Sequence, residues 1–187
     1  MRIATFLFLF AWSVSGHPQN LVQNANFDDG LAGWSISPTT YTATLNTTDG
    51  LPTPPSAELI GSDFNEAPQP AFYSPCFTVD ASKIYSFSAN YKVIAGEMSI
   101  EFIAYPNVNC ISGTTENMPS INVPQSNGWV TATASDFTFN ETSVAAQLIF
   151  ATCCASSGPS GADVLIDHVD FRVQGTTPVR LQSFGVE

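Results

Sequence analysis

The chain has 187 residues, of which 11% are charged, and its 5 Lys and Arg against 16 Asp and Glu give a formal net charge of −11 at pH 7. So few cations exclude the functions that rest on clustered Lys and Arg, namely binding of nucleic acid and of anionic membrane surfaces. A neutral partner or a bound cation is compatible with this balance.

The first 16 residues have the order of a secretory signal peptide. Arg2 supplies the positive start, residues 3–12 are apolar, and residues 13–16 are small. The apolar run is shorter than the ~20 residues that span a bilayer, and no second stretch is long enough. We therefore expect a secreted protein without a membrane span. Its signal peptide covers residues 1–16, one domain covers residues 17–174, and a tail covers residues 175–187.

The mature sequence shows the alternation of β-strands and almost no helical periodicity. The first strands are expected at residues 57–60 and 72–79, the second of them interrupted by Pro75 and therefore bulged or at an edge. The clearest alternation follows, with polar residues separating Tyr85, Phe87, Ala89, Tyr91 and Val93. It predicts a half-buried strand that ends in a turn at Ala95-Gly96.

Further strands are expected at residues 98–105, 129–139, 144–152 and 164–173. A long loop over residues 106–127 contains one short strand near residues 121–123. In the strand at 98–105, Met98, Ile100, Phe102 and Ala104 share one face, and Ser99, Glu101, Ile103 and Tyr105 share the other. In the strand at 144–152, the apolar face is Val144, Ala146, Leu148 and Phe150. Many short strands separated by Gly and Pro predict an all-β, antiparallel sandwich.

The chain, which is expected to be exported, has four cysteines: Cys76, Cys110, Cys153 and Cys154. An even number in an oxidising compartment predicts disulfides. Adjacent cysteines rarely bridge each other, so Cys76 and Cys110 are each expected to be bridged, either to each other or to Cys153 and Cys154.

Four segments carry a resemblance. Residues 20–34 read NLVQNANFDDGLAGW, residues 164–171 read VLIDHVDF, and YSFSA at 85–89 and GWV at 128–130 lie between them. In this order they resemble carbohydrate-binding modules of families four and nine and their relatives. The resemblance implies a jelly-roll β-sandwich that opens with an Asn-rich strand, binds a polysaccharide or another glycan, and has no catalytic activity. It implies that Trp34 and Trp129 pack the sandwich.

Many such modules hold a structural calcium ion, and the matching residues are Asp28 and Asp167. Period two puts Leu165, Asp167, Val169 and Phe171 on one face, so Asp167 is expected in line with core residues. A buried carboxylate is costly unless it is paired or binds a metal, and calcium prefers carboxylate and carbonyl oxygens. The alternative is that Asp167 caps a turn or accepts hydrogen bonds from backbone amides.

Candidate glycan contacts are polar and aromatic residues that point away from the core. Aromatic faces suit the apolar faces of pyranose rings, and amides and carboxylates supply hydrogen bonds. The candidates are Tyr73, Asn90, Glu101, Tyr105 and Gln147. The alternative is that they are ordinary solvated sheet residues.

Catalytic signatures are missing from the sequence. A glycosidase needs two carboxylates at a set separation, and Asp167 and Asp170 are expected on opposite faces of their strand. There is no Gly-x-Ser-x-Gly and no His-Glu-x-x-His motif. The expected function is therefore a secreted, non-catalytic carbohydrate-binding module. The alternatives are a structural or adhesive extracellular sandwich without a glycan ligand, and a hydrolase whose site is assembled only by the fold.

Overall fold

The computed structural model describes residues 19–36, 41–61, 69–111, 116–117, 120–153 and 162–175. The expected signal peptide lies outside the described residues, and so does the expected tail after Gly175. The described part contains no helix that is long and apolar enough to cross a membrane.

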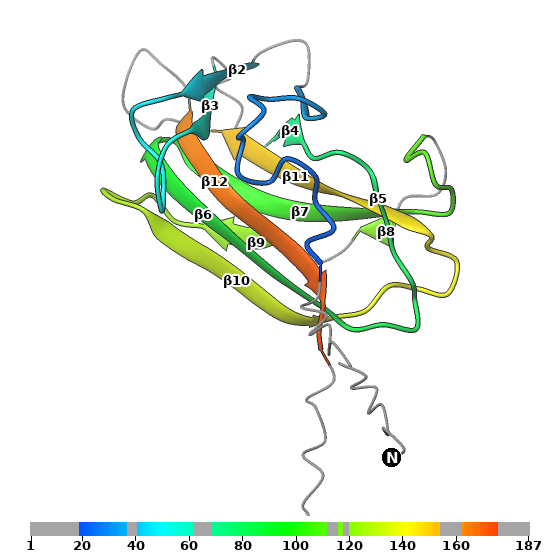
Figure 1. Ribbon diagram of the computed structural model, residues 1–187. Helices are drawn as coiled ribbons and strands as arrows, with labels where there is room; N and C mark the ends of the chain where they lie inside the picture. The colour runs from blue at the N-terminus through cyan, green and yellow to red at the C-terminus, as the bar shows by residue number, and fades with distance from the viewer. Residues whose placement is uncertain are drawn as a thin grey trace, which may run out of the picture.

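Two antiparallel sheets make up the molecule (Figure 1). The seven-stranded sheet has the order β1-β4-β11-β7-β8, with β5 paired to β11 and β9 paired to β7. The five-stranded sheet has the order β10-β6-β12-β3-β2. The strands are β1 Ser35–Ile36, β2 Tyr41–Asn46, β3 Ser56–Gly61, β4 Gln69–Tyr73, β5 Phe77–Thr78, β6 Tyr85–Ala95, β7 Glu97–Tyr105, β8 Glu116–Asn117, β9 Ile121–Val123, β10 Val130–Phe137, β11 Ala145–Cys153 and β12 Asp163–Val173.

The core fills the space between the sheets, as the alternation predicts. The inward side chains of β6 and β7 are those expected from the sequence, and Ala146, Leu148 and Phe150 of β11 join them. Phe171 of β12 lies at the centre of an aromatic cluster formed with Phe77, Tyr85, Phe102, Phe137 and Phe139. A second cluster joins Trp34 to Phe27, Phe72 and Phe150, so the packing role expected for Trp34 is confirmed.

Several strand boundaries differ from the sequence-based expectation. The segment at 72–79 forms two strands, β4 and β5, because the chain leaves the sheet around Pro75. Val144 precedes β11 and is 36% exposed, so it is not part of the apolar face. The short strands β1, β2 and β8 were not expected from the sequence.

The opening segment is made of turns where the resemblance implied a strand. It is nevertheless tied to β12. The side-chain amide of Asn20 donates to the backbone carbonyl of Val169 over 2.8 Å. The backbone amide of Val169 donates to the backbone carbonyl of Ala25 over 2.9 Å. These contacts fix Phe27 and Trp34 over one end of the core.

A bulge in β12 overturns the expected face of Asp167. His168 has a positive φ of 47°, and the pairing with β6 shifts between Asp167 and Asp170. Val164 and Ile166 therefore point into the core before the bulge, and Val169 and Phe171 do so after it. Leu165 and Asp167 lie on the outer face of the five-stranded sheet.

The same shift places Asp170 on that outer face, since it pairs with Ser88 while Asp167 pairs with Asn90. The expectation that Asp167 and Asp170 point to opposite faces is wrong for this reason.

One disulfide joins Cys76 to Cys110, with a Cα–Cα distance of 5.9 Å. It is the first of the pairings left open by the sequence. It links the segment between β4 and β5 to the loop after β7. Cys154 and the side chain of Cys153 lie outside the described part of the chain.

Candidate ligand-binding face

The candidate ligand residues Tyr73, Glu101, Tyr105 and Gln147 come together on the outer face of the seven-stranded sheet. They come from β4, β7 and β11, which are neighbours in that sheet. Ile149 of β11 pairs with Tyr73 on one side and Glu101 on the other, so the three residues form one row across the strands. We call this surface the outer β4-β11-β7 face.

Hydrogen bonds fix the Gln147 amide on this face. The Tyr105 hydroxyl donates to Gln147 Oε1 over 3.1 Å, and Gln147 Nε2 donates to the Ser74 carbonyl over 3.0 Å. Ser74 is itself buried, and its hydroxyl accepts the Leu148 amide over 3.0 Å. The amide keeps one free donor hydrogen and one free acceptor site for a ligand.

A serine holds the Glu101 carboxylate in a similar way. The Ser99 hydroxyl donates to Glu101 Oε1 over 3.2 Å, from two residues earlier on the same face of β7. Ser99 is buried and Glu101 is half-buried. The second carboxylate oxygen can therefore accept a hydrogen bond from a ligand hydroxyl.

The two tyrosines stay protonated across the physiological range. Burial raises the pKa of the Tyr73 hydroxyl, and the nearby Glu101 charge raises it further. Burial also raises the pKa of the Tyr105 hydroxyl, with a smaller contribution from Tyr73. Tyr73 therefore offers a hydroxyl donor beside a carboxylate acceptor.

The aromatic surface of this face comes from Tyr73. Tyr73 is half-buried, whereas Tyr105 is only 8% exposed. The two tyrosines thus differ in role, because the ring of Tyr73 is accessible to a ligand while Tyr105 orients Gln147. Ser74 and Ser99, which support the site, were not singled out in the sequence, where small buried serines carry no distinguishing signal.

Asn90 is not part of this group. It lies on β6, in the five-stranded sheet, and is 8% exposed. Its Nδ2 donates to the Leu51 carbonyl over 3.0 Å, and its Oδ1 accepts the Thr131 hydroxyl over 2.8 Å. The Asn90 amide therefore helps to hold the loop between β2 and β3 against the sheet.

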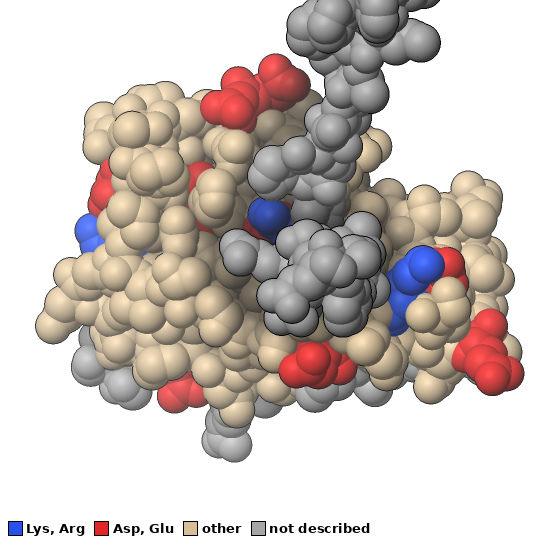
Figure 2. Space-filling view, turned by 60° about the horizontal axis from the view of Figure 1, so that its bottom comes forward, with Lys and Arg blue, Asp and Glu red and all other residues tan. Residues whose placement is uncertain are grey.

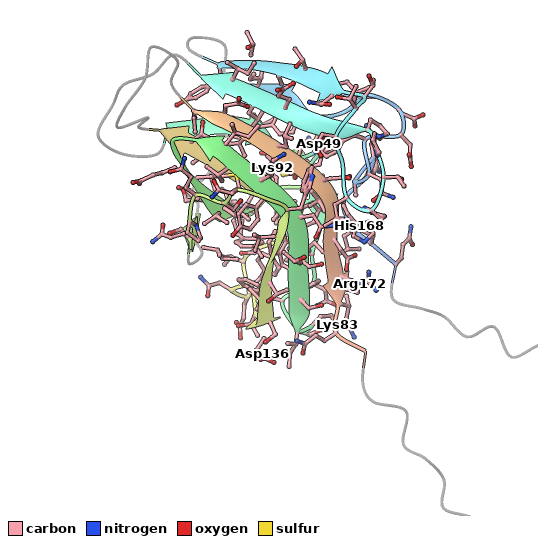
Figure 3. The ribbon with its side chains drawn as sticks, turned by 90° about the vertical axis from the view of Figure 1, so that its left-hand side faces the viewer. Asp49, Lys83, Lys92, Asp136, His168 and Arg172 are labelled. Carbon is pink, nitrogen blue, oxygen red and sulfur yellow. A yellow bond between two sulfur atoms is a disulfide. The ribbon has the colours of Figure 1, made fainter. Side chains whose placement is uncertain are left out.

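Trp129 also holds the loop between β2 and β3. Its expected role in packing the sandwich is therefore wrong. Its indole nitrogen donates to Asp49 Oδ1 over 2.7 Å, and Lys92 forms an ion pair with Asp49 Oδ2 at 2.8 Å. Figure 3 shows Asp49 and Lys92 beside each other near one end of the sheet. Both contacts lower the pKa of Asp49. Residue 129 lies just before β10, and its half-buried ring lies outside the core, on the outer face of the five-stranded sheet.

Asp167 is the third anchor of the loop. Its Oδ2 accepts the Leu51 amide over 2.8 Å, and its Oδ1 accepts the amide of His168 over 2.6 Å. This is the backbone-amide alternative that the sequence left open. Burial raises the pKa of Asp167, the two amides oppose that shift, and the charge of Asp28 adds to it.

Of the two expected calcium ligands, Asp28 and Asp167, the charge of Asp28 is the smallest contribution to the raised pKa of Asp167. Within the described residues, no group of three or more His, Cys, Asp or Glu side chains could hold a metal ion. Further calcium ligands there would be backbone carbonyls, side-chain amide oxygens or water molecules.

The sequence matches no protein-family model and no curated protein. Solved structures share its fold at low sequence identity. A Clostridium thermocellum xylanase fragment with a family 22 carbohydrate-binding module, complexed with xylohexaose, is 18% identical with a TM-score of 0.56, covering 84% of this chain and 28% of that one. A family 4 carbohydrate-binding module is 15% identical with a TM-score of 0.58, covering 82% and 99%.

The enzymatically active domain of the bacteriophage CBA120 tailspike protein 4 is 15% identical with a TM-score of 0.57. It aligns over 83% of this chain, which spans 21% of the tailspike chain. The fold is therefore the jelly-roll β-sandwich of carbohydrate-binding modules, as expected from the sequence.

Proposed function

We propose that this protein is a secreted, non-catalytic carbohydrate-binding module that holds a polysaccharide on its outer β4-β11-β7 face. The observation that supports this most is the convergence of Tyr73, Glu101 and Gln147 from three neighbouring strands, with the amide of Gln147 oriented by Tyr105. A half-buried aromatic ring beside a carboxylate and an oriented amide is the combination that grips sugar rings.

A binding panel tests the proposal. The mature protein is titrated with xylan, β-1,4-glucan, mannan and β-1,4-galactan by calorimetry and affinity electrophoresis. We expect saturable binding to one glycan class, weakened about tenfold or more by Tyr73→Ala, since contacts buried at the centre of a site contribute most of the affinity. Tyr105→Phe removes the hydrogen bond to Gln147 and is expected to weaken binding about threefold to tenfold.

Thr133→Ala is the matched control, since this residue lies on β10 of the other sheet, opposite Ser88. Failure of the folded protein to bind any of the four polymers would contradict the proposal. It would favour the structural or adhesive alternative.

We also propose a structural calcium ion at Asp28 and Asp167. The support is that the Asp167 carboxylate is buried at 2% exposure and that Asp28 is among the groups that raise its pKa. Because a ligand that binds only the folded state stabilises it, chelation should lower the melting temperature, and Asp28→Asn should abolish that decrease. A melting temperature unaffected by chelation would leave Asp167 solely as the loop anchor.

A further inference from the structure

Acidic side chains lie on the outer β4-β11-β7 face. Glu101 lies in its central row. Glu97 lies four residues earlier in β7 and therefore on the same face, because side chains alternate between the two faces of a strand. The pKa of Tyr73 responds to the charge of Glu101. A ligand on this face therefore lies beside negative charge.

The basic residues of the described part lie elsewhere (Figure 3). Lys92 and Arg172 lie on the outer face of the five-stranded sheet, where they pair with Asp49 and Asp170. Lys83 lies in the turn before β6. On the face that Figure 2 shows, basic residues likewise form no patch. In the described part of the chain, no Lys or Arg is placed to neutralise an anionic ligand beside Glu101.

From this we infer that the face selects uncharged polysaccharides and rejects those that carry carboxylates, such as polyuronates. The inference rests on the proposed function and names its ligand class. Hydroxyl groups of a neutral sugar can donate to the free oxygen of Glu101 and exchange hydrogen bonds with Gln147. A sugar carboxylate would instead meet Glu101 as a like charge without a compensating cation, which disfavours the wrong ligand.

Matched polymers test the inference on the full mature protein. Glucan, mannan and galactan are each compared with the same polymer after oxidation of its primary hydroxyls to carboxylates, and neutral arabinoxylan is compared with glucuronoxylan. We expect the carboxylated form of the bound polymer to bind about tenfold more weakly at low ionic strength. The difference should shrink as salt is added, because salt screens exposed charges.

Two variants distinguish the local charge from the net charge. Glu101→Gln should reduce at least threefold the ratio of the affinity for the neutral polymer to the affinity for its carboxylated form. Asp136→Asn removes the same charge from an exposed position on β10, where Figure 3 labels it, and should leave the ratio unchanged.

Equal or tighter binding of a carboxylated polymer would overturn the inference and leave the proposed function intact. So would an equal effect of the two variants. Failure of every polymer to bind would overturn the proposed function and the inference with it.

Discussion

The pKa values of two acidic residues near Lys92 shift in opposite directions. These residues are Asp49 and Asp163. Hydrogen bonds from Lys92 and Trp129 lower the pKa of Asp49. Burial raises the pKa of Asp163, the charge of Glu58 raises it further, and Lys92 only partly opposes them. One oxygen of Asp163 is buried without a hydrogen-bond partner. The ionised form of Asp163 is therefore a cost to the folded protein.

The variant Asp163→Asn should stabilise the protein at neutral pH. Because the folded state raises the pKa of Asp163, this residue's contribution to stability falls as pH rises from the free value of 3.8 to the folded value. We expect the melting temperature to rise by about 2–4 °C at pH 7, as ~1 kcal/mol would produce in a chain of this size.

Melting curves at pH 7 and pH 3 check this, since the benefit should disappear where both states are protonated. A benefit of the same size at both pH values would show that charge is not the cause. Asp136→Asn, at an exposed position, is the control.

For single residues, the alternation along a strand predicts only which face of the sheet a side chain is on. Alternation placed Glu101, Tyr105 and Gln147 on outward positions, and sheet pairing brought them together. The same reasoning placed Asn90 correctly on an outer face. It could not show that the loop between β2 and β3 covers that face, because the contact joins residues 39 positions apart.

At the scale of elements, the bulge in β12 decides which residues face the core. The sequence predicted the strand but not the bulge, because only a few per cent of non-glycine residues have a positive φ, and His, although enriched among them, usually does not. A regular strand that continued from Val164 and Ile166 would turn Val169 and Phe171 away from the core. The bulge returns these two residues to the core, while Asp167 stays on the outer face and accepts the Leu51 amide.

Substitutions at His168 test the bulge. A β-branched residue is strongly disfavoured at positive φ, whereas Asn tolerates it. We expect His168→Val to lower the free energy of unfolding by about 1–2 kcal/mol and His168→Asn to change it by less than about 0.5 kcal/mol. Both variants lose the 3.0 Å contact between His168 Nδ1 and Asn26, so their difference isolates the backbone. Equal losses in urea denaturation would assign the effect to that contact.

At the scale of the whole molecule, the sandwich is held by contacts between segments far apart in the chain. The Asn20 amide and the Val169 carbonyl are separated by 149 residues, and the Tyr41 hydroxyl donates across the sheets to the carbonyl of Thr152. The two-sheet class followed from alternation, and the jelly-roll connectivity from the resemblance. The edges of the seven-stranded sheet could not be predicted, because β1 and β8 have two residues each and carry no periodicity.

Phe171 connects the two sheets and gives the last prediction. It is fully buried on β12, and its ring lies 5.9 Å from Phe102 of the opposite sheet and 5.3 Å from Tyr85 of its own. Phe171→Leu keeps an apolar side chain but loses these ring contacts. We expect a loss of about 2 kcal/mol in the free energy of unfolding, since aromatic pairs add to simple burial.

The more peripheral Phe77→Leu, at 6% exposure, should cost less. Because the core and the outer β4-β11-β7 face are separate, the folded Phe171→Leu protein should bind glycan with unchanged affinity at 10 °C while unfolding at lower urea concentration. Loss of binding in a variant that is still folded at that temperature would show instead that the face depends on packing beneath it. Tyr73 and Gln147 would then be positioned by the whole sandwich rather than by their own sheet.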